Sequence, residues 1–287
     1  MNSAGTQSCA TTRAAQTSQL RRAIEITLTV AFWIALGIAL HLSAYAYLLL
    51  GIPITAVFQW GVRREPLRAL WLRSAQPFRL DFAGWLIALL LAAYPCYRFV
   101  TYLPSGPQPA KAGLYLCAIA GAFPAAYTLR NFHRATVRSL LLCLAIAGSI
   151  GVAIMVGGAV AGGAAHRTLA QRLSIGIAAL LMNLPLTFAV EEVSFRGAFD
   201  SYLHHSDEPH GFVTALFVSA LWGLWHLPIG LGQAPLPLVI AQLLVVHCTI
   251  GVPFSIFWRR SGNLFVPGST HALIDAVRDA LFVLPWQ

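Results

Sequence analysis

The chain has 287 residues, of which 57% are hydrophobic and only 10% are charged. In soluble proteins roughly a quarter of the residues are charged. This composition therefore excludes an ordinary soluble enzyme and indicates an integral membrane protein. The net charge of +9 comes from 18 arginines and a single lysine. The arginines lie at the ends of apolar runs, as the positive-inside rule predicts, so they indicate topology rather than nucleic-acid binding.

The first 22 residues are polar, rich in Ser, Thr, Ala and Gln, and lack the apolar core of a signal peptide. They are predicted to form a disordered cytoplasmic tail. The five cysteines are scattered and form no Cys-x-x-Cys pair, so they predict neither a disulfide framework nor a cysteine zinc site.

Thirty-seven residues without Asp, Glu, Lys or Arg separate Glu25 from Arg63. A single helix of that length would measure about 55 Å, against a hydrocarbon core of about 30 Å, so we expect two spans that turn near His41. The hydropathy pattern predicts an all-α, polytopic transmembrane bundle of about nine spans, with eight as the alternative. They are expected at residues 25–41, 44–61, 82–103, 112–129, 139–160, 173–195, 211–229, 236–257 and 264–284.

Charge counting supports this arrangement. With the N-terminus in the cytoplasm, fourteen arginines lie on the cytoplasmic side, against five outer cations. The outer five are Arg98, Lys111, Arg167, Arg172 and Arg278. The glycine-rich segment 157–165 suits either close helix packing or a turn at a helix end. We expect residues 23–170 to form N-terminal spans and residues 171–287 to form a catalytic transmembrane domain.

Polar residues suited to catalysis are concentrated after residue 180. Glu191 and Glu192 lie in the sixth predicted span, and Arg196 follows Glu192 by four residues, a helical spacing that suits an ion pair. Glu191 points about 100° away on a helix, which predicts a different role. His226 lies in the next span, and His271 and Asp275 share one face of the last. Each could be a packing residue, but ionisable groups at membrane depth are costly, so together they indicate a functional site.

These three motifs resemble the CAAX-protease and bacteriocin-processing family of intramembrane proteases. The resemblance covers residues 180–277 through Glu191-Glu192-Val-Ser-Phe-Arg196, Trp222-Gly-Leu-Trp-His226 and His271-Ala-Leu-Ile-Asp275. Two positions differ from the usual pattern. Trp222 replaces a phenylalanine, which we expect to affect packing more than chemistry. Asp275 stands where eukaryotic prenyl proteases have asparagine, so it is expected to orient His271 rather than to donate to an oxyanion.

The resemblance implies hydrolysis of a peptide bond in or near the membrane. Glu191 would be the general base, His226 would position the water, and His271 would stabilise the oxyanion. Glu192 and Arg196 would hold the first motif in place. No cofactor is favoured, but zinc bound by Glu191, His226 and His271 is the alternative.

Two other functions fit a buried polar cluster. A proton-coupled transporter would favour an internal repeat, and none is visible in the sequence. A catalytically silent immunity or binding protein would have lost a motif residue, whereas all the key positions except the Asn/Asp choice are filled. The Ala- and Arg-rich composition indicates a GC-rich bacterial genome, and hence an inner-membrane enzyme that matures or sorts a membrane-associated protein or peptide. His247 matches no motif and is predicted to be a packing residue.

Overall fold

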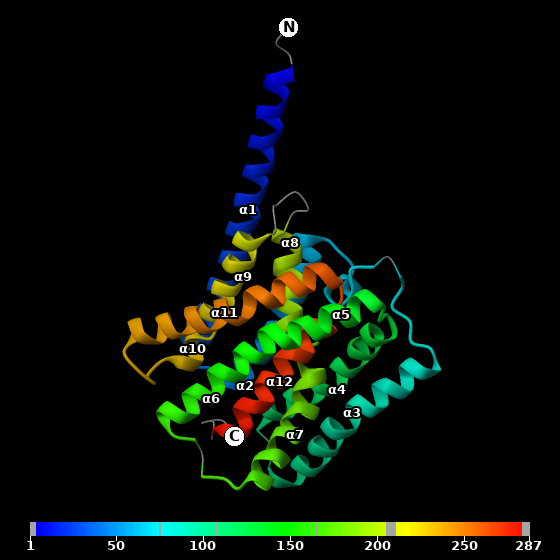
Figure 1. Cartoon of the computed structure of the whole chain (residues 1–287), viewed down its shortest axis with the longest axis vertical. Coiled ribbons are helices and arrows are strands. Elements are labelled where there is room, and N and C mark those ends of the chain that lie inside the picture. Colours follow the sequence, from blue (N-terminus) through cyan, green and yellow to red (C-terminus); the bar gives the residue numbers. More distant parts are fainter. Residues whose placement is uncertain (1–3, 75, 107, 165, 205–210, 283–287) are drawn as a thin grey trace.

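The computed structural model describes residues 4–74, 76–106, 108–164, 166–204 and 211–282, with side chains from Ser18 onward. Within these ranges the chain is helical, and its one β-type contact is an isolated bridge between Leu72 and Asn263. The all-α class predicted from the sequence is therefore confirmed. Figure 1 shows the helices as one bundle, with the N-terminal end of α1 far from the end of α12.

The helices follow one another along the chain with short connections. They are α1 (Ala4–Ala39), α2 (Ala44–Val57), η1 (Phe58–Arg63), η2 (Leu67–Leu70), α3 (Phe82–Tyr102), η3 (Leu103–Ser105), α4 (Pro109–Arg130), α5 (Arg134–Cys143), η4 (Leu144–Gly148), α6 (Ser149–Gly162), α7 (Leu169–Leu186), η5 (Val193–Asp200), α8 (Ser201–Leu203), α9 (Phe212–Trp225), α10 (Leu227–Gly230), α11 (Leu236–Ser261) and α12 (Phe265–Leu281). Three of them, η1, η4 and η5, are π-helices.

Among the described residues, seven helices are long and apolar enough to cross a membrane. They are Ser18–Ala39, Ala44–Arg63, Phe82–Ser105, Pro109–Arg130, Arg134–Gly162, Leu169–Leu186 and Leu236–Ser261. The remaining two predicted spans form the shorter helices α9, of 14 residues, and α12, of 17 residues. The polytopic bundle is thus confirmed. His226 is the C-cap of the short helix α9, and His271 lies within the short helix α12.

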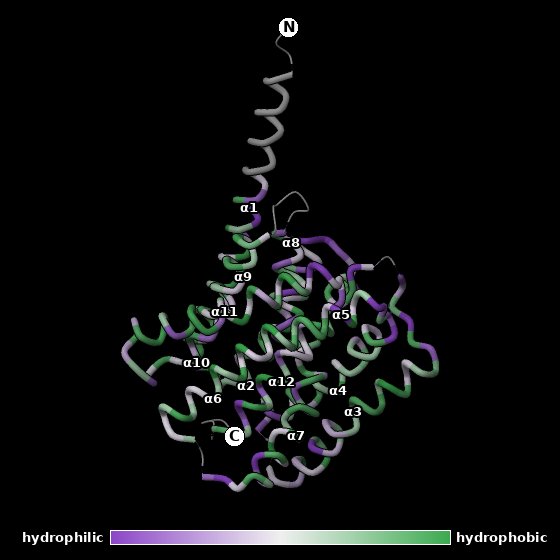
Figure 2. The backbone as a smooth tube through the Cα atoms, viewed as in Figure 1, coloured by the Kyte–Doolittle hydropathy of each residue, from purple (hydrophilic) through white to green (hydrophobic). Residues whose placement is uncertain are grey.

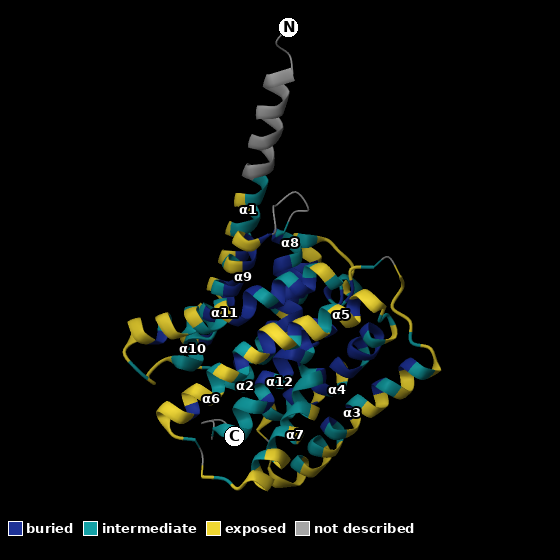
Figure 3. Cartoon of the chain, viewed as in Figure 1, coloured by how far each residue is buried: buried dark blue, intermediate teal, exposed yellow. Residues whose placement is uncertain are grey.

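The outer surface of the bundle is apolar. Large hydrophobic side chains such as Phe82 and Val160 are more than 80% exposed, which is the arrangement expected where lipid rather than water is the solvent. Figure 2 shows hydrophobic residues along α3 and α4, and Figure 3 shows that exposed residues cover the outer faces of α3 and α6 while buried ones gather in the centre.

The N-terminal segment differs from the prediction. We expected residues 1–22 to be a disordered tail, but α1 begins at Ala4 and continues without a break into the first span. The segment is rich in alanine, glutamine and arginine, which favour helix, and it contains no proline. Residues 1–3 lie outside the described residues. The polar composition therefore indicated exposure to solvent, not the absence of helix.

The glycine-rich segment does not pack closely against another helix. A Cβ atom at Gly157 or Gly162 would meet nothing within 4 Å, and α6 ends at Gly162 before a residue with a φ of +87°. Of the two readings offered by the sequence, the turn at a helix end is the one observed.

Close helix packing occurs elsewhere. A Cβ atom at Gly121 on α4 would lie 2.1 Å from the carbonyl oxygen of Pro185 on α7, and one at Gly223 on α9 would lie 2.6 Å from that of Leu243 on α11. Only glycine allows backbones to approach so closely. These two contacts fix the helices that carry the candidate site.

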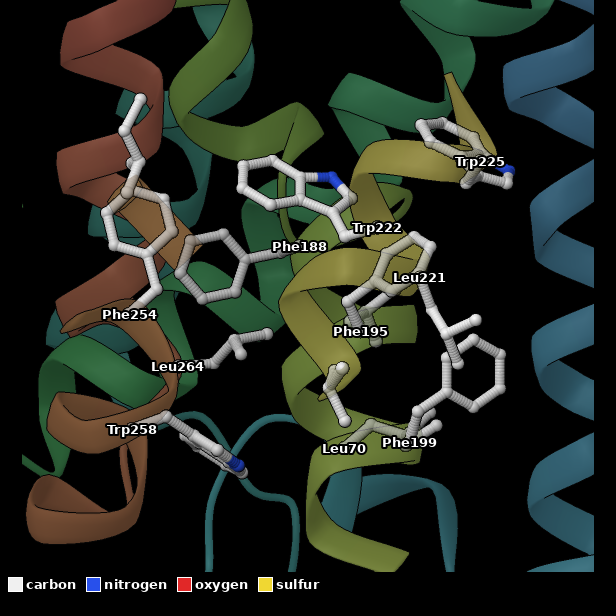
Figure 4. Close-up of a cluster of buried hydrophobic side chains, with 14 of the residues drawn as sticks. Leu70, Phe188, Phe195, Phe199, Leu221, Trp222, Trp225, Phe254, Trp258 and Leu264 are labelled. Carbon is white, nitrogen blue, oxygen red and sulfur yellow. The ribbon is translucent and has the colours of Figure 1, made fainter. Parts of the chain in front are cut away.

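An aromatic cluster fills the interior between α1, η5, α9 and α11. Trp33, Phe195, Trp225 and Phe254 are completely buried, with Trp225 packed against Trp33 at a ring-centroid distance of 5.0 Å. Figure 4 shows side chains from several helices meeting in this cluster, among them Trp222 and Phe254. Large aromatic groups supply much of the packing energy of a core, so the short α9 is held by its contacts.

Candidate active site

The first motif lies where a helix changes its winding. Helix α7 ends at Leu186, directly after Pro185, and the chain turns over residues 187–190 before it becomes helical again at Glu191. Residues Val193–Asp200 form the π-helix η5, and all eight of them are buried. Such π-helical segments are frequent at functional sites because they alter which side chains face inward. Both glutamates therefore lie at the start of a fully buried helix.

Glu192 is completely buried and binds two partners. Its Oε1 atom accepts a hydrogen bond from Arg196 Nη1 at 3.2 Å and lies 2.9 Å from His271 Nδ1. The i, i+4 ion pair predicted from the sequence is thus present. The bond to His271 was not predicted, and it joins the first motif directly to the last.

Arg196 is enclosed on all sides. Its Nη2 atom donates to the backbone carbonyl of Gly251 on α11 at 3.3 Å, and its guanidinium lies 4.3 Å from the ring centre of Trp222 and 5.2 Å from that of Phe254. A carboxylate, a carbonyl and two aromatic faces offset part of the cost of burying this cation, while its Nε atom has no hydrogen-bond partner among the described residues. Arg196 consequently ties η5 to α9 and α11.

Glu191 points in another direction, as its helical position predicts. Its side chain is 16% exposed, and its Oε2 atom accepts a hydrogen bond from the indole Nε1 of Trp222 at 3.1 Å. The same oxygen lies 3.6 Å from His226 Nε2 and 3.9 Å from His271 Nε2. The structure therefore brings the three predicted catalytic residues together around one carboxylate oxygen.

His226 caps the C-terminal end of α9. Its Nδ1 atom lies 2.9 Å from the backbone carbonyl of Trp222, and since a carbonyl only accepts, Nδ1 carries the hydrogen. In neutral His226 the Nε2 atom, which faces Glu191, is then an acceptor. Glu191 and His226 together present two acceptors to a water molecule.

His271 lies behind this pair and is 6% exposed. Its Nδ1–H donates to Glu192, while its Nε2 lies 3.6 Å from Asp275 Oδ2. Asp275 also forms a 2.7 Å ion pair with Arg278. Glu192 is therefore the carboxylate that hydrogen-bonds His271, a role that the sequence suggested for Asp275.

Trp222 does more than the sequence analysis expected. We expected its replacement of phenylalanine to affect packing more than chemistry, but the indole also donates a hydrogen bond to Glu191, which phenylalanine cannot do. The expectation treated the aromatic position as part of the core. In the fold, α9 places the polar edge of the indole against the proposed base.

His247 is the residue that the motifs missed. Its ring centre lies 4.3 Å from that of His226 and 4.6 Å from that of Trp222, and its Nδ1 binds the carbonyl of Leu243 at 2.7 Å. No motif marks this position in the sequence, because His247 reaches His226 only through the packing of α11 against α9. The predicted packing role and a position beside His226 are compatible.

A cavity of about 500 Å³ opens in front of Glu191 and His226. This volume is within the range typical of ligand-binding sites. Its apolar wall comes from α2, α4 and α7 and includes Leu48, Leu114, Met182, Leu186 and Val190, and its polar wall includes Asp275 and Arg278 from α12. The cavity therefore joins the N-terminal spans to the catalytic motifs.

The three residues do not form a preformed zinc site. Tetrahedral ligands about 2.0–2.1 Å from zinc lie about 3.3–3.5 Å from one another, whereas both histidines are farther than that from Glu191 Oε2. The indole N–H of Trp222 also points at that oxygen, where a metal would bind. Across the described ranges, no group of three His, Cys, Asp or Glu side chains is arranged to hold a metal ion.

Comparison with known proteins agrees with the motifs. Residues 172–277, somewhat more than a third of the chain, match the family described as type II CAAX prenyl endopeptidase Rce1-like. This stretch contains all three motifs, and the resemblance to the CAAX-protease and bacteriocin-processing family is thereby confirmed. Comparisons with curated proteins and with solved structures give no match.

The family match supports a general class for the protein. Residues 172–277 are similar to an intramembrane CAAX-type endopeptidase, a hydrolase that acts on a protein or peptide at the membrane. Residues 4–171 lie outside the match, although α2, α3 and α4 contribute to the cavity wall.

Proposed function

We propose that the protein cleaves a membrane-associated protein or peptide by means of a water molecule activated by Glu191. The observation that carries this proposal is the convergence of Glu191, His226 and His271 within 4 Å of one carboxylate oxygen, with Glu191 and His226 open to the cavity. Three ionisable groups brought together from distant parts of the chain beside one cavity are costly in a membrane interior, and catalysis accounts for their presence.

The first half of the reaction needs a base and an oriented water. Glu191 accepts a proton from the water, and Nε2 of His226 accepts its other hydrogen in a hydrogen bond. The water oxygen attacks the carbonyl carbon of the scissile peptide bond, and the electron pair of the C=O double bond moves to the oxygen. The indole of Trp222 holds the carboxylate of Glu191 in position during this step.

The second half needs a donor to the oxyanion and a proton for the leaving group. In its imidazolium form His271 donates Nδ1–H to Glu192, and its Nε2–H is available to the oxyanion. The C–N bond then breaks as the electron pair of the oxyanion reforms the carbonyl, and the proton held by Glu191 passes to the leaving nitrogen. The products are a carboxylic acid and an amine.

Glu191→Gln tests the base. The amide keeps the shape of the side chain but cannot accept the proton, so cleavage should fall by a factor of about 10² to 10⁴. The measurement is proteolysis of membrane proteins in cells of the source organism or by purified protein, with the exposed Glu65→Gln as the matched control. A Glu191→Gln variant as active as the wild type would remove this mechanism and favour a proton-coupled carrier.

A second experiment tests the metal-free form of the proposal. Exhaustive treatment with a strong chelator should leave cleavage unchanged, and the purified protein should contain well under one zinc per chain. Zinc at one per chain, with loss of cleavage on its removal and recovery on its return, would make Glu191, His226 and His271 the ligands. The His226→Gln variant would then also lose the metal.

We further infer an inner-membrane location in a bacterial cell, with the N-terminus in the cytoplasm. The excess of arginine on one side of the helices supports this orientation. Maturation or sorting of a membrane-anchored protein fits the position of the cavity within the spans.

A further inference from the structure

The cavity that holds Glu191 also gathers positive charge. Five cations were assigned to the outer side of the membrane in the sequence analysis, against the general trend of the chain. Four of these five line the same cavity: Arg98, Lys111, Arg167 and Arg278. Cations on the outer side are not needed for topology, so their concentration in one cavity requires another explanation.

Two of the four cations have structural partners. Arg278 forms ion pairs with Asp275 at 2.7 Å and with Asp279 at 2.9 Å. Arg167 donates to the backbone carbonyls of Asp279 at 2.6 Å and Phe282 at 3.2 Å, at the end of α12. These contacts satisfy carbonyl groups that the helix end leaves free. Both arginines therefore stabilise the end of α12.

The other two cations have only tyrosine partners. Arg98 Nη1 donates to the hydroxyl of Tyr94 at 3.2 Å, and Lys111 Nζ lies 5.6 Å and 5.5 Å from the ring centres of Tyr45 and Tyr102. In the described part of the chain, no carboxylate lies within ion-pair distance of either cation. Aromatic faces and a hydroxyl stabilise a cation without neutralising its charge. Arg98 and Lys111 thus leave net positive charge in the cavity wall.

The position of Lys111 strengthens the argument. It lies in the first turn of α4, whose N-terminus has no side-chain cap. The N-terminal end of a helix carries partial positive charge, which disfavours a lysine there and favours an anion. A bound anion would interact favourably with both the helix end and the ammonium group.

We propose that Arg98 and Lys111 form a carboxylate-binding subsite for the peptide whose bond Glu191 hydrolyses. The proposal rests on the proposed function, because it takes the occupant of the cavity to be the substrate. Apolar side chains line the same cavity as the catalytic pair and the two cations, among them Leu48, Leu114 and Val190. The preferred occupant is thus a short apolar peptide segment with a carboxylate at one end or on a side chain.

Binding of matched peptides to the purified full-length protein tests the subsite. The probes are N-acetyl-Leu-Leu-Ala as the C-terminal acid and as the amide, which examine a terminal carboxylate. N-acetyl-Leu-Asp-Ala-amide and its Asn counterpart examine a side-chain carboxylate. Affinity is measured by thermal stabilisation in a non-ionic detergent, since a ligand that binds only the folded state raises the unfolding temperature.

We expect at least one acid to bind about tenfold more tightly than its neutral partner, the scale of one charge-assisted contact of about 1.4 kcal/mol. The Arg98→Gln/Lys111→Gln double variant should lose this preference and keep its affinity for the neutral peptides. Arg172→Gln removes a cation from the same side but outside the cavity wall, and it should retain the preference. Equal binding of acids and amides by the wild type, or a preference that survives in the double variant, would overturn the subsite.

A lipid phosphate is the competing occupant, and a further arm distinguishes it. Two results together would show that the pair binds a headgroup and that the proposal is wrong. Added phosphatidylglycerol would abolish the preference of the wild type for acids over neutral peptides. It would also raise the unfolding temperature by itself, but only when Arg98 and Lys111 are present. The Glu191→Gln variant separates this result from failure of the proposed function. It should bind the acids as the wild type does, because the subsite does not include Glu191. An intact preference for the acids together with undiminished proteolysis by Glu191→Gln would leave the subsite standing and remove the protease mechanism.

Discussion

Trp222 shows how one side chain organises the site. Its indole donates to Glu191, one face of its ring receives the guanidinium of Arg196, and its neighbours include His247 and His271. The backbone carbonyl of the same residue fixes the tautomer of His226. A single position on α9 therefore contacts the proposed base, the buried ion pair and all three histidines of the region. In a dry interior such shared contacts hold a constellation more rigidly than separate pairs would.

The first residue-scale prediction concerns the indole N–H. Trp222→Phe keeps an aromatic ring but removes the hydrogen bond to Glu191, so cleavage should fall by about 10- to 100-fold, the kinetic equivalent of one hydrogen bond to a charged group. Trp225→Phe is the matched control. The indole N–H of Trp225 is buried and has no hydrogen-bond partner among the described residues, so this variant loses ring volume alone. Equal rates in the two variants would assign Trp222 a packing role only.

At the scale of elements, helix packing positions the motifs that the helices carry. The first motif follows α7, and α7 is held against α4 where Gly121 meets Pro185. The opposite end of η5 is held by a buried ion pair in which Arg259 Nη2 lies 2.6 Å from Asp200 Oδ1. Arg259 is one of the arginines counted toward the cytoplasmic excess. Part of the topology signal thus also secures the helix that follows Glu191 and Glu192.

Gly121→Ala tests the α4–α7 contact. The new Cβ would lie 2.1 Å from a backbone oxygen, so the helices must separate, and overpacking of this kind costs about 1–3 kcal/mol. Both the unfolding temperature and the cleavage rate should fall, because Pro185 precedes Glu191 by six residues. Gly157→Ala is the control on α6, where nothing lies within 4 Å, and it should leave stability unchanged or raise it by about 0.5–1 kcal/mol. An unfolding temperature unchanged by Gly121→Ala would contradict this packing contact.

For the whole molecule, the crossing pattern decides where the cavity opens. The nine crossings predicted from the sequence are an odd number, and Figure 1 shows the N-terminal end of α1 opposite the end of α12. The residues that line the cavity include Tyr45, Lys111 and Arg167, near the starts of α2, α4 and α7, together with Arg278 near the end of α12. If the N-terminus is cytoplasmic, all four lie on the outer half of the membrane.

Reporter fusions test this topology. Reporters fused after residues 74, 107, 134, 166, 205, 233 and 261 should be alternately cytoplasmic and external, beginning with cytoplasmic. The reason is that one predicted crossing separates each fusion point from the next. The measurement is the activity of alkaline phosphatase and of a fluorescent reporter at each site. A cytoplasmic signal from the fusion after residue 107 would show that the first two spans are wrongly divided.

The sequence by itself determined the class of fold, the three motifs and the pairing of Glu192 with Arg196. These properties depend on composition, hydropathy and i, i+4 spacing, which involve residues that are close together in the sequence. It did not reveal that α1 begins at Ala4, because the polar composition of the first 22 residues was interpreted as a sign of disorder. The tertiary structure alone decided that Glu192 binds His271, that the indole of Trp222 reaches Glu191, and that His247 lies beside His226. Such contacts join residues 21 to 79 positions apart, and their geometry depends on how close two helices can approach, which glycines at the crossings set.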